Sequence, residues 1–136
     1  MSLELRRIGV YGRCIVDGAV LLTRLSRLEP ERGKWTLPGG GVEFGESPTD
    51  TLVREFDEET GLDPRIGPFL DVYSRVYPPN ARRGALHVLQ FVYEVTASGE
   101  PEVRELDGST SEVAWVDLSE VGRLELVDMA VWALAL

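Results

Sequence analysis

The chain has 136 residues, which suits one domain spanning 1–136 that buries its own hydrophobic core without disulfides or structural metals. Its formal net charge of −9 disfavours nucleic-acid binding, because a phosphate backbone is repelled by an acidic surface, although metal cations can screen a small anionic ligand. Cys14 is the only cysteine, so no internal disulfide framework or cysteine-rich zinc site is expected, and a cytoplasmic location is favoured.

A β-hairpin is predicted near the N-terminus. Residues 6–16 are rich in β-branched and aromatic side chains, which favour a strand. Asp17-Gly18 is a two-residue turn signal, and the segment from Ala19 to Thr23 continues the strand pattern. The first two strands should therefore run antiparallel.

The next segment is expected to be irregular. Residues 24–34, RLSRLEPERGK, combine charge with Pro and Gly, so we expect a mobile loop. The residues from Trp35 to Pro38 are expected to form a strand, and the three glycines from Gly39 to Gly41 a further loop.

A central helix is marked at both ends. Ser47 can cap it, Pro48 suits its first turn, Asp50 completes a capping-box pattern and Gly61 suits a left-handed terminus. At about 100° per residue, one arc of this helix is apolar and another is acidic. The apolar arc holds Leu52, Val53 and Phe56, and the acidic arc holds Glu55, Glu58 and Glu59, with Glu59 nearest the apolar border.

The second half of the chain predicts more strands and a closing helix. Strand patterns cover about 66–77 and 85–96, joined by a Pro- and Arg-containing loop, and the second pattern is apolar on both faces, as in a covered central strand. A short strand is expected from Glu112 to Val116, Asp117 with Glu120 resembles a capping box, and a helix is expected from Leu126 to Leu136.

This order of elements predicts an α/β or α+β layered domain with a mixed sheet. The N-terminal segment lacks the continuous apolar stretch of a signal peptide, and the C-terminal run MAVWALAL is too short to span a bilayer. We therefore expect no association with a membrane.

The stretch REFDEETG, residues 54–61, places four acids where the helix ends. A helix C-terminus already carries partial negative charge, so each acid there costs a few tenths to about 1 kcal/mol, and like charges one turn apart add to that cost. One interpretation is a solvated acidic face. The other is a site for a hard divalent cation, because carboxylates one turn apart can share Mg²⁺ and leave positions for water and phosphate oxygens.

The surrounding sequence resembles the Nudix box, G-x5-E-x7-R-E-U-x-E-E-x-G-U, in which U is a bulky apolar residue. Gly40 is followed by Glu46 after five residues, and then after seven by Arg54 and the rest of the motif to Leu62. Every fixed letter matches, and the mild departure is Phe56, where the family usually has an aliphatic residue. The resemblance implies a Nudix-type α/β/α sandwich with a mixed β-sheet.

The resemblance also implies roles for the box residues. Glu55, Glu58 and Glu59 are expected to bind Mg²⁺, or Mn²⁺ as a substitute, with the carbonyl of Gly39 as a further ligand. Glu46 and Arg54 resemble the pair that supports the loop and helix, and a purely geometric role is favoured over direct catalysis for them.

The residue that takes a proton from the attacking water is left open. Glu58 and Glu59 are candidates within the box, and Glu112 is the first candidate outside it, ahead of Glu102 and Glu105. His87 is expected to be a wall or core residue. Several cations can meet substrate phosphates or simply be solvated: Arg24, Arg27, Arg32, Lys34, Arg82 and Arg83.

The implied function is divalent-metal-dependent hydrolysis of a diphosphate linkage in a small nucleotide, by attack of water at phosphorus. The substrate class covers a nucleoside triphosphate and a nucleoside diphosphate linked to another group. One alternative is a non-catalytic nucleotide-sensing domain, which the intact set of acids disfavours. A diphosphate isomerase is the other, and Cys14 in the first hairpin is poorly placed for it.

The substrate itself is not specified by the sequence. Tyr77 and Pro78 stand side by side in a region where the family's tyrosine suggests dinucleoside polyphosphates and its proline suggests ADP-ribose. The expected partner is therefore a small-molecule nucleotide, with no nucleic acid and no membrane, and a homodimer is left open.

Overall fold

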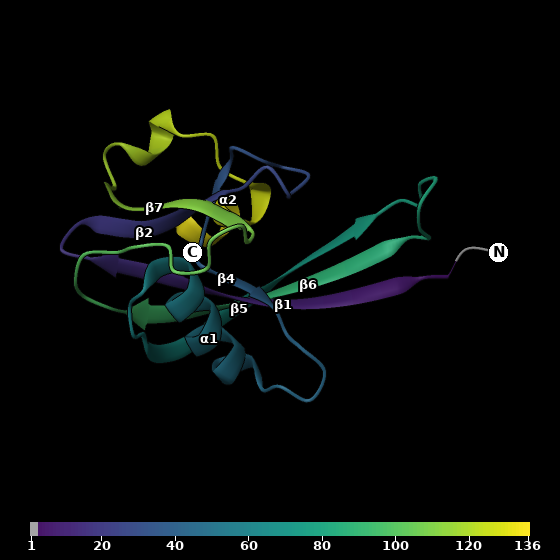
Figure 1. Cartoon of the computed structure of the whole chain (residues 1–136), viewed down its shortest axis with the longest axis horizontal. Helices are drawn as coiled ribbons and strands as arrows, with labels where there is room; N and C mark the ends of the chain where they lie inside the picture. Colours follow the sequence, from purple (N-terminus) through teal and green to yellow (C-terminus); the bar gives the residue numbers. More distant parts are fainter. Residues whose placement is uncertain (1–2) are drawn as a thin grey trace.

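The computed structural model describes residues 3–136 and shows one mixed sheet with a helix on either side (Figure 1). The sheet order is β3-β2-β1-β6-β5, with β4 paired to β1 and β7 paired to β2. The elements are β1 Leu5–Val16, β2 Ala19–Leu25, β3 Trp35–Thr36, β4 Gly39–Gly41, α1 Pro48–Thr60, β5 Arg65–Tyr77, β6 Leu86–Thr96, β7 Thr110–Asp117, η1 Val121–Arg123 and α2 Asp128–Leu134.

The predicted hairpin is confirmed, and its turn explains the pairing of β1 with β2. Asp17 and Gly18 both have positive φ, 51° and 78°, as a type I′ turn requires. This turn matches the twist of the two strands and sets Ile15 opposite Val20. The earlier part of β1, from Leu5 to Cys14, pairs in parallel with β6.

The glycines predicted as a loop instead form β4, which pairs antiparallel with β1. Gly39 has φ 152°, and a Cβ there would lie 2.1 Å from the carbonyl oxygen of Val10, so only glycine allows this close approach. The expectation failed because strand propensity disfavours glycine, whereas the contact between two backbones demands it.

The C-terminal predictions need two corrections. Glu120 precedes η1 without a side-chain cap, and its N–H bonds to the carbonyl of Asp117 in an ordinary turn, so no capping box forms. The closing helix spans Asp128–Leu134, which is shorter than predicted, because the backbone N–H of Val127 pairs with Trp35 and holds the preceding residues extended.

Two hydrophobic clusters lie on opposite faces of the sheet and confirm the layered fold. Val10, Leu52 and Phe56 are fully buried in the cluster beneath α1. Val92 and Ala130 belong to the cluster beneath α2. Among residues 3–136 no helix is long and apolar enough to cross a membrane.

Beyond these helices the sheet continues as a protrusion, seen on the right of Figure 1. It is formed by the start of β1, the end of β5 and the start of β6, and we call residues 3–8 and 72–90 the arm. The prediction that β6 is covered on both faces holds only for its second half. Val92 and Val95 are buried there, on opposite faces, whereas on the arm Val88 is buried but Leu86 and Leu89 are partly exposed.

Candidate active site

Helix α1 carries the acidic residues, and its ends are fixed as predicted. Ser47 Oγ accepts a hydrogen bond from the N–H of Asp50 at 3.2 Å, and Gly61 ends the helix in the left-handed region at φ 69°. Leu52 and Phe56 are fully buried against the sheet. Since these contacts fix the rotation of the helix, the acidic arc turns toward β4 and the segment before β7.

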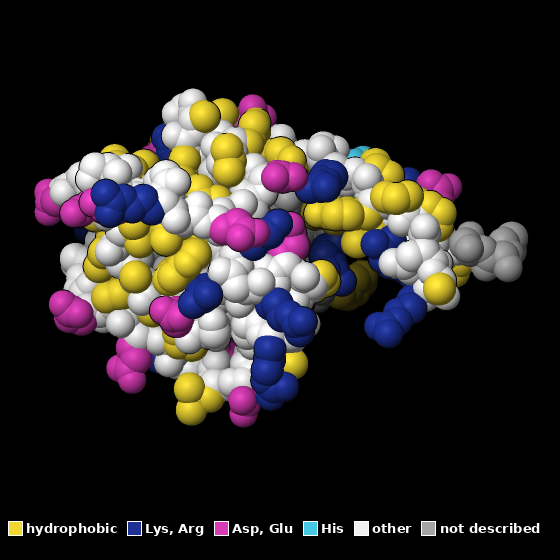
Figure 2. All heavy atoms as spheres, turned by 90° about the horizontal axis from the view of Figure 1, so that it is seen from above, with side chains coloured by type: hydrophobic (Ala, Val, Ile, Leu, Met, Phe, Trp, Pro, Cys, Tyr) yellow, Lys and Arg dark blue, Asp and Glu magenta, His cyan; other side chains and the backbone are white. Residues whose placement is uncertain are grey.

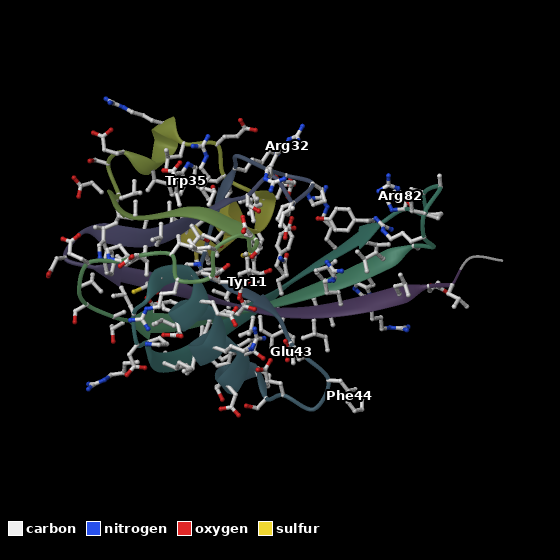
Figure 3. The ribbon with its side chains drawn as sticks, viewed as in Figure 1. Tyr11, Arg32, Trp35, Glu43, Phe44 and Arg82 are labelled. Atoms are coloured by element: carbon white, nitrogen blue, oxygen red, sulfur yellow. The ribbon has the colours of Figure 1, made fainter. Side chains whose placement is uncertain are left out.

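An acidic pocket of about 250 Å³ lies along this arc. Its lining contains five glutamates, one arginine and two hydroxyl residues: Glu43, Arg54, Glu55, Glu58, Glu59, Glu105, Ser109 and Thr110. Glu43 comes from the connection between β4 and α1 and is labelled in the lower half of Figure 3. Because Arg54 is the only cation in this lining, the pocket holds a large excess of negative charge.

Glu46 and Arg54 form the ion pair that their positions in the box imply. Arg54 donates from Nε to Glu46 Oε2 at 2.9 Å and from Nη2 to Oε1 at 3.0 Å. Thr51 also donates to Glu46 Oε1, at 2.6 Å. The bond from Arg54, then that from Thr51, lowers the pKa of Glu46 to about 2, so this carboxylate stays ionised. The pair links the loop before α1 to the helix.

Arg54 also reaches into the acidic pocket. Its Nη1 donates to Glu55 Oε1 at 2.9 Å and lies 3.6 Å from Glu58 Oε2. Burial nevertheless raises the pKa of Glu55 to about 7, because it outweighs the opposing attraction of Arg54. Arg54 therefore compensates only part of the charge that the pocket collects.

Glu59 is buried and connects three elements. Its Oε1 accepts the N–H of Gly39 in β4 at 2.8 Å, and its Oε2 accepts the hydroxyl of Thr110 in β7 at 2.6 Å. Burial raises its pKa to about 8, although both hydrogen bonds oppose that shift. Glu59 is therefore a clamp between helix and strands in this structure, and its role as a metal ligand stays a prediction.

Glu58 meets a carboxylate from outside the box. The N–H groups of Arg104 and Glu105 both donate to the carbonyl of Glu58, at 2.8 and 2.9 Å, which brings the segment after β6 onto the helix end. Burial, then the hydrogen bond with the side chain of Glu105, raises the pKa of Glu58. Both residues line the acidic pocket, and neighbouring carboxyl groups oppose each other's ionisation, so such a pair favours binding of a proton or a cation.

The donor set fits a hard divalent cation that is completed by a ligand. Within residues 3–136, no three acidic, histidine or cysteine side chains stand in the arrangement of a preformed metal cage. Mg²⁺ in phosphoryl-transfer sites usually takes one or two carboxylates, several waters and substrate phosphates, so it does not need such a cage. The carboxylates of Glu55 and Glu58 line the pocket, and burial raises the pKa of each although they share Arg54 as a counter-charge.

Other predicted residues lie away from the acidic pocket. Glu112, the first candidate outside the box, is not among its lining residues and pairs with Arg24 at 2.9 Å on the surface of β7 and β2. Glu105, which the sequence analysis places behind Glu112, does line the pocket. His87 forms a hydrogen bond with Ser74 at 2.9 Å on the arm and is not among the residues that line the pocket.

The predicted cations are also mostly engaged elsewhere. Arg24 donates to the carbonyl of Gly33 at 3.0 Å, so it holds the turn-rich segment that was expected to be mobile. Lys34 pairs with Glu31 at 3.2 Å. Arg82 and Arg83 lie at the tip of the arm, where their backbone N–H groups donate to Asn80 Oδ1 (Figure 3 labels Arg82).

Sequence reasoning missed three residues of the site. Ser109 and Thr110 carry no motif, and their only signal is a run of hydroxyls, Ser109 to Ser111, just before β7. Glu43 lies among the variable letters of the box.

Comparisons with known proteins identify the family of the chain. The family model described as NUDIX domain matches residues 5–133. An ADP-ribose pyrophosphatase of Methanocaldococcus jannaschii is 35% identical over 117 residues, which cover 86% of this chain and 65% of that protein. A CTP pyrophosphohydrolase of Escherichia coli is 36% identical over 59 residues, covering 43% of this chain and 44% of that protein. The chain therefore spans less than two thirds of the length of these curated relatives.

Solved structures extend the comparison to the whole fold. A MutT NUDIX hydrolase from Burkholderia pseudomallei is 32% identical, has a TM-score of 0.80, and is matched over 97% of this chain and 98% of that one. The NUDIX domain of Shewanella oneidensis NrtR, solved with ADP ribose, is 23% identical and has a TM-score of 0.72. The match covers 99% of this chain and 86% of that one, and at this identity it shows a similar fold alone. With the family model matched over nearly all of its length, the chain belongs to the Nudix family.

Proposed function

We propose that the chain hydrolyses a diphosphate linkage in a small nucleotide with the help of Mg²⁺ or Mn²⁺. The observation that carries the proposal is the acidic pocket, in which five glutamates face one arginine. A diphosphate is itself an anion, so a pocket of this charge accepts it only together with cations. The family name and the names of relatives that act on ADP-ribose and CTP support the reaction class.

The residues in and around the pocket have different proposed roles. Glu55 and Glu58 would hold the cation, because both line the pocket and stand one turn of α1 apart. When bound, the cation neutralises diphosphate oxygens and acidifies a coordinated water. Arg54 and Glu46 keep the helix and its preceding loop in register through their two-bond ion pair. Gly39 is the proposed source of a further carbonyl ligand.

The pair of Glu58 and Glu105 is the best-placed proton acceptor. Both side chains line the acidic pocket, and Glu105 comes from a segment that is tied to the helix end by two backbone hydrogen bonds. Glu59 is less suitable, because both of its oxygens already accept hydrogen bonds from Gly39 and Thr110. Glu112 is a second candidate, and its pairing with Arg24 outside the pocket lowers its rank.

The substrate proposal covers nucleoside triphosphates and nucleoside diphosphates linked to another group. The test is a product-resolved screen of ADP-ribose, CTP, the dNTPs, ADP-sugars and diadenosine polyphosphates with Mg²⁺. We expect turnover of at least one of them, lost by a factor of about 10² or more in Glu58→Gln. Asp50→Asn is the matched control, since Asp50 is exposed on the same helix and lies outside the pocket.

Two results would contradict this proposal. Tight binding of one nucleotide without turnover of any would favour the sensing domain. Turnover of a non-nucleotide diphosphate alone would retain the metal chemistry and remove the nucleotide from the proposal.

A further inference from the structure

The arm is a part of the sheet whose face on the α1 side lacks a cover. Ile8 and Val10 point to the same face of β1, because they are two residues apart in the strand. Val10 is fully buried in the cluster that contains Phe56, whereas Ile8 is 44% exposed. Val76 lies one row further out on this face, opposite His87, and is 61% exposed.

The opposite face of the arm is covered only near its base, where Tyr73 packs against Trp132 of α2, Arg75 pairs with Asp128 at 2.8 Å and Val88 is buried. Leu5 is 42% exposed, and its neighbour across the pairing, Leu86, is only partly buried. The pairing of β1 with β6 is parallel here, and parallel strands with apolar residues on both faces are found almost only where both faces are covered. Within residues 3–136, α2 reaches only the base of the arm, through Tyr73 and Arg75. Ile8, Val76 and Leu5 remain exposed, so the single chain does not cover these apolar side chains.

The accessible surface supports the same conclusion. The chain exposes 8143 Å², whereas a compact monomer of its 15.1 kDa mass exposes about 7,100 Å² by the usual scaling with mass. The excess of about 1,000 Å² compares with the ~800 Å² per partner that a stable protein interface buries. One interface of ordinary size would therefore account for the surplus.

The arm and the rest of the molecule carry opposite charges. Of the 14 Lys and Arg residues, five lie on the arm, whereas of the 23 Asp and Glu residues only Glu4 does. The arm thus has a formal charge of +4 and the remaining residues −13. Figure 2 shows the basic side chains interspersed with apolar ones on the arm, at the right. The basic residues of the arm are Arg6, Arg7, Arg75, Arg82 and Arg83.

We propose that two copies of the chain form a two-fold dimer in which each arm packs on the acidic body of the other copy. In a two-fold interface every contact occurs twice. The basic apolar arm of each copy would therefore contact the acidic apolar surface of the other copy. Contact between the two arms is disfavoured, because it would place their arginines together.

The acidic counterpart is the connection between β4 and α1. Phe44 is fully exposed there and projects away from the body in Figure 3. It lies between Glu43 and the exposed Asp50, so this surface offers an aromatic ring flanked by carboxylates to the partner's arm. A bound nucleic acid is the competing occupant of the basic arm, and the −13 charge of the body opposes it.

The test is the mass of the wild-type chain in solution at micromolar to submillimolar concentration, measured by sedimentation equilibrium. We expect twice the 15.1 kDa chain mass, and dissociation as salt rises from about 0.05 to about 0.5 M, because screening weakens the charge attraction. A wild-type monomer, or a dimer that tightens with salt, would overturn the proposal.

Variants on both sides of the interface identify the surfaces. Val76→Asp and Phe44→Ala should each weaken the dimer at least about tenfold, as buried interface residues do. Val131→Asp is the matched control, since Val131 is 55% exposed but lies on α2, on the other side of the sheet from α1. Unchanged melting temperatures check that each variant folds.

Two further outcomes would refute the arm's role. One is a dimer that survives both Val76→Asp and Phe44→Ala. The other is an RNA oligonucleotide that binds the wild-type chain and is released by Arg82→Glu with Arg83→Glu. Since none of these residues lines the acidic pocket, hydrolysis by the variants is measured separately, and its absence in the wild type would count only against the proposed function.

Discussion

Strand β1 runs through two environments that differ in what covers them. Val10 lies in the body between β4, β6 and α1 and is completely buried, whereas Ile8, on the same face of the same strand, is 44% exposed on the arm. The body holds the acidic pocket, where tight packing forces carboxylates together. In the body, packing holds the carboxylates close together despite their repulsion. On the arm, apolar side chains stay exposed because the body does not cover them.

The largest loss of stability is expected from a substitution in the body, at the glycines of β4. Gly39→Ala would place a Cβ 2.1 Å from the carbonyl oxygen of Val10 at φ 152°, so we expect a loss of about 3 kcal/mol or more, or failure to fold. Gly41→Ala meets no atom within 4 Å and should cost about 1 kcal/mol at most. Urea unfolding of both variants measures this, and equal losses would contradict the close approach of β4 to β1.

The next effect compares body and arm directly along β1. Val10→Ala removes fully buried methyl groups and should cost about 2 kcal/mol, because a cavity remains beneath α1. Ile8→Ala should cost less than about 1 kcal/mol at low protein concentration, where the arm is solvated. A cost for Ile8→Ala as large as that for Val10→Ala in dilute solution would show that the arm is covered within the single chain.

A smaller effect tests the clamp made by Glu59. Thr110→Val removes the hydroxyl that donates to Glu59 at 2.6 Å and should cost about 1–3 kcal/mol, because a buried carboxylate loses a donor. Thr23→Val is the same change at a buried hydroxyl that has no hydrogen-bond partner among the described residues, so it should be neutral or stabilising. If the two variants unfolded at the same urea concentration, the hydrogen bond of Thr110 would have no special role.

Local signals made α1 and its acids predictable. Ser47, Gly61 and the pair of Glu46 and Arg54 lie within one short stretch, and each has a backbone or charge reason for its position. Thr110 was not predictable, because it stands 51 residues after Glu59 and approaches it only through the pairing of β7 with β2. Glu105 reaches the pocket through backbone hydrogen bonds to Glu58, which leave no side-chain signature in the sequence.

The pH dependence of metal-free stability follows from the same carboxylates. Their ordinary pKa is 4.5, and burial raises that of Glu55 to about 7 and that of Glu59 to about 8. The folded chain therefore binds these protons more tightly than the unfolded chain does, so this stabilisation is complete below about pH 4.5 and is lost as pH rises through about 7 and 8. Glu46 acts oppositely, with a pKa lowered to about 2, and its stabilisation is lost only as pH falls from about 4.5 toward 2.

The most direct test of the acidic pocket as a cation-dependent site is a thermal melt with and without Mg²⁺ at about pH 5 and about pH 8. A cation that binds only the folded chain stabilises it by about 2.7 kcal/mol at one hundred times its dissociation constant. We predict a rise in melting temperature with Mg²⁺ that is larger at about pH 8, where the carboxylates are ionised. The double variant Glu55→Gln with Glu58→Gln should melt no lower than the wild type without metal and should lose the response to Mg²⁺. An absent Mg²⁺ response in the wild type, or a large loss of metal-free stability in the double variant, would contradict the account.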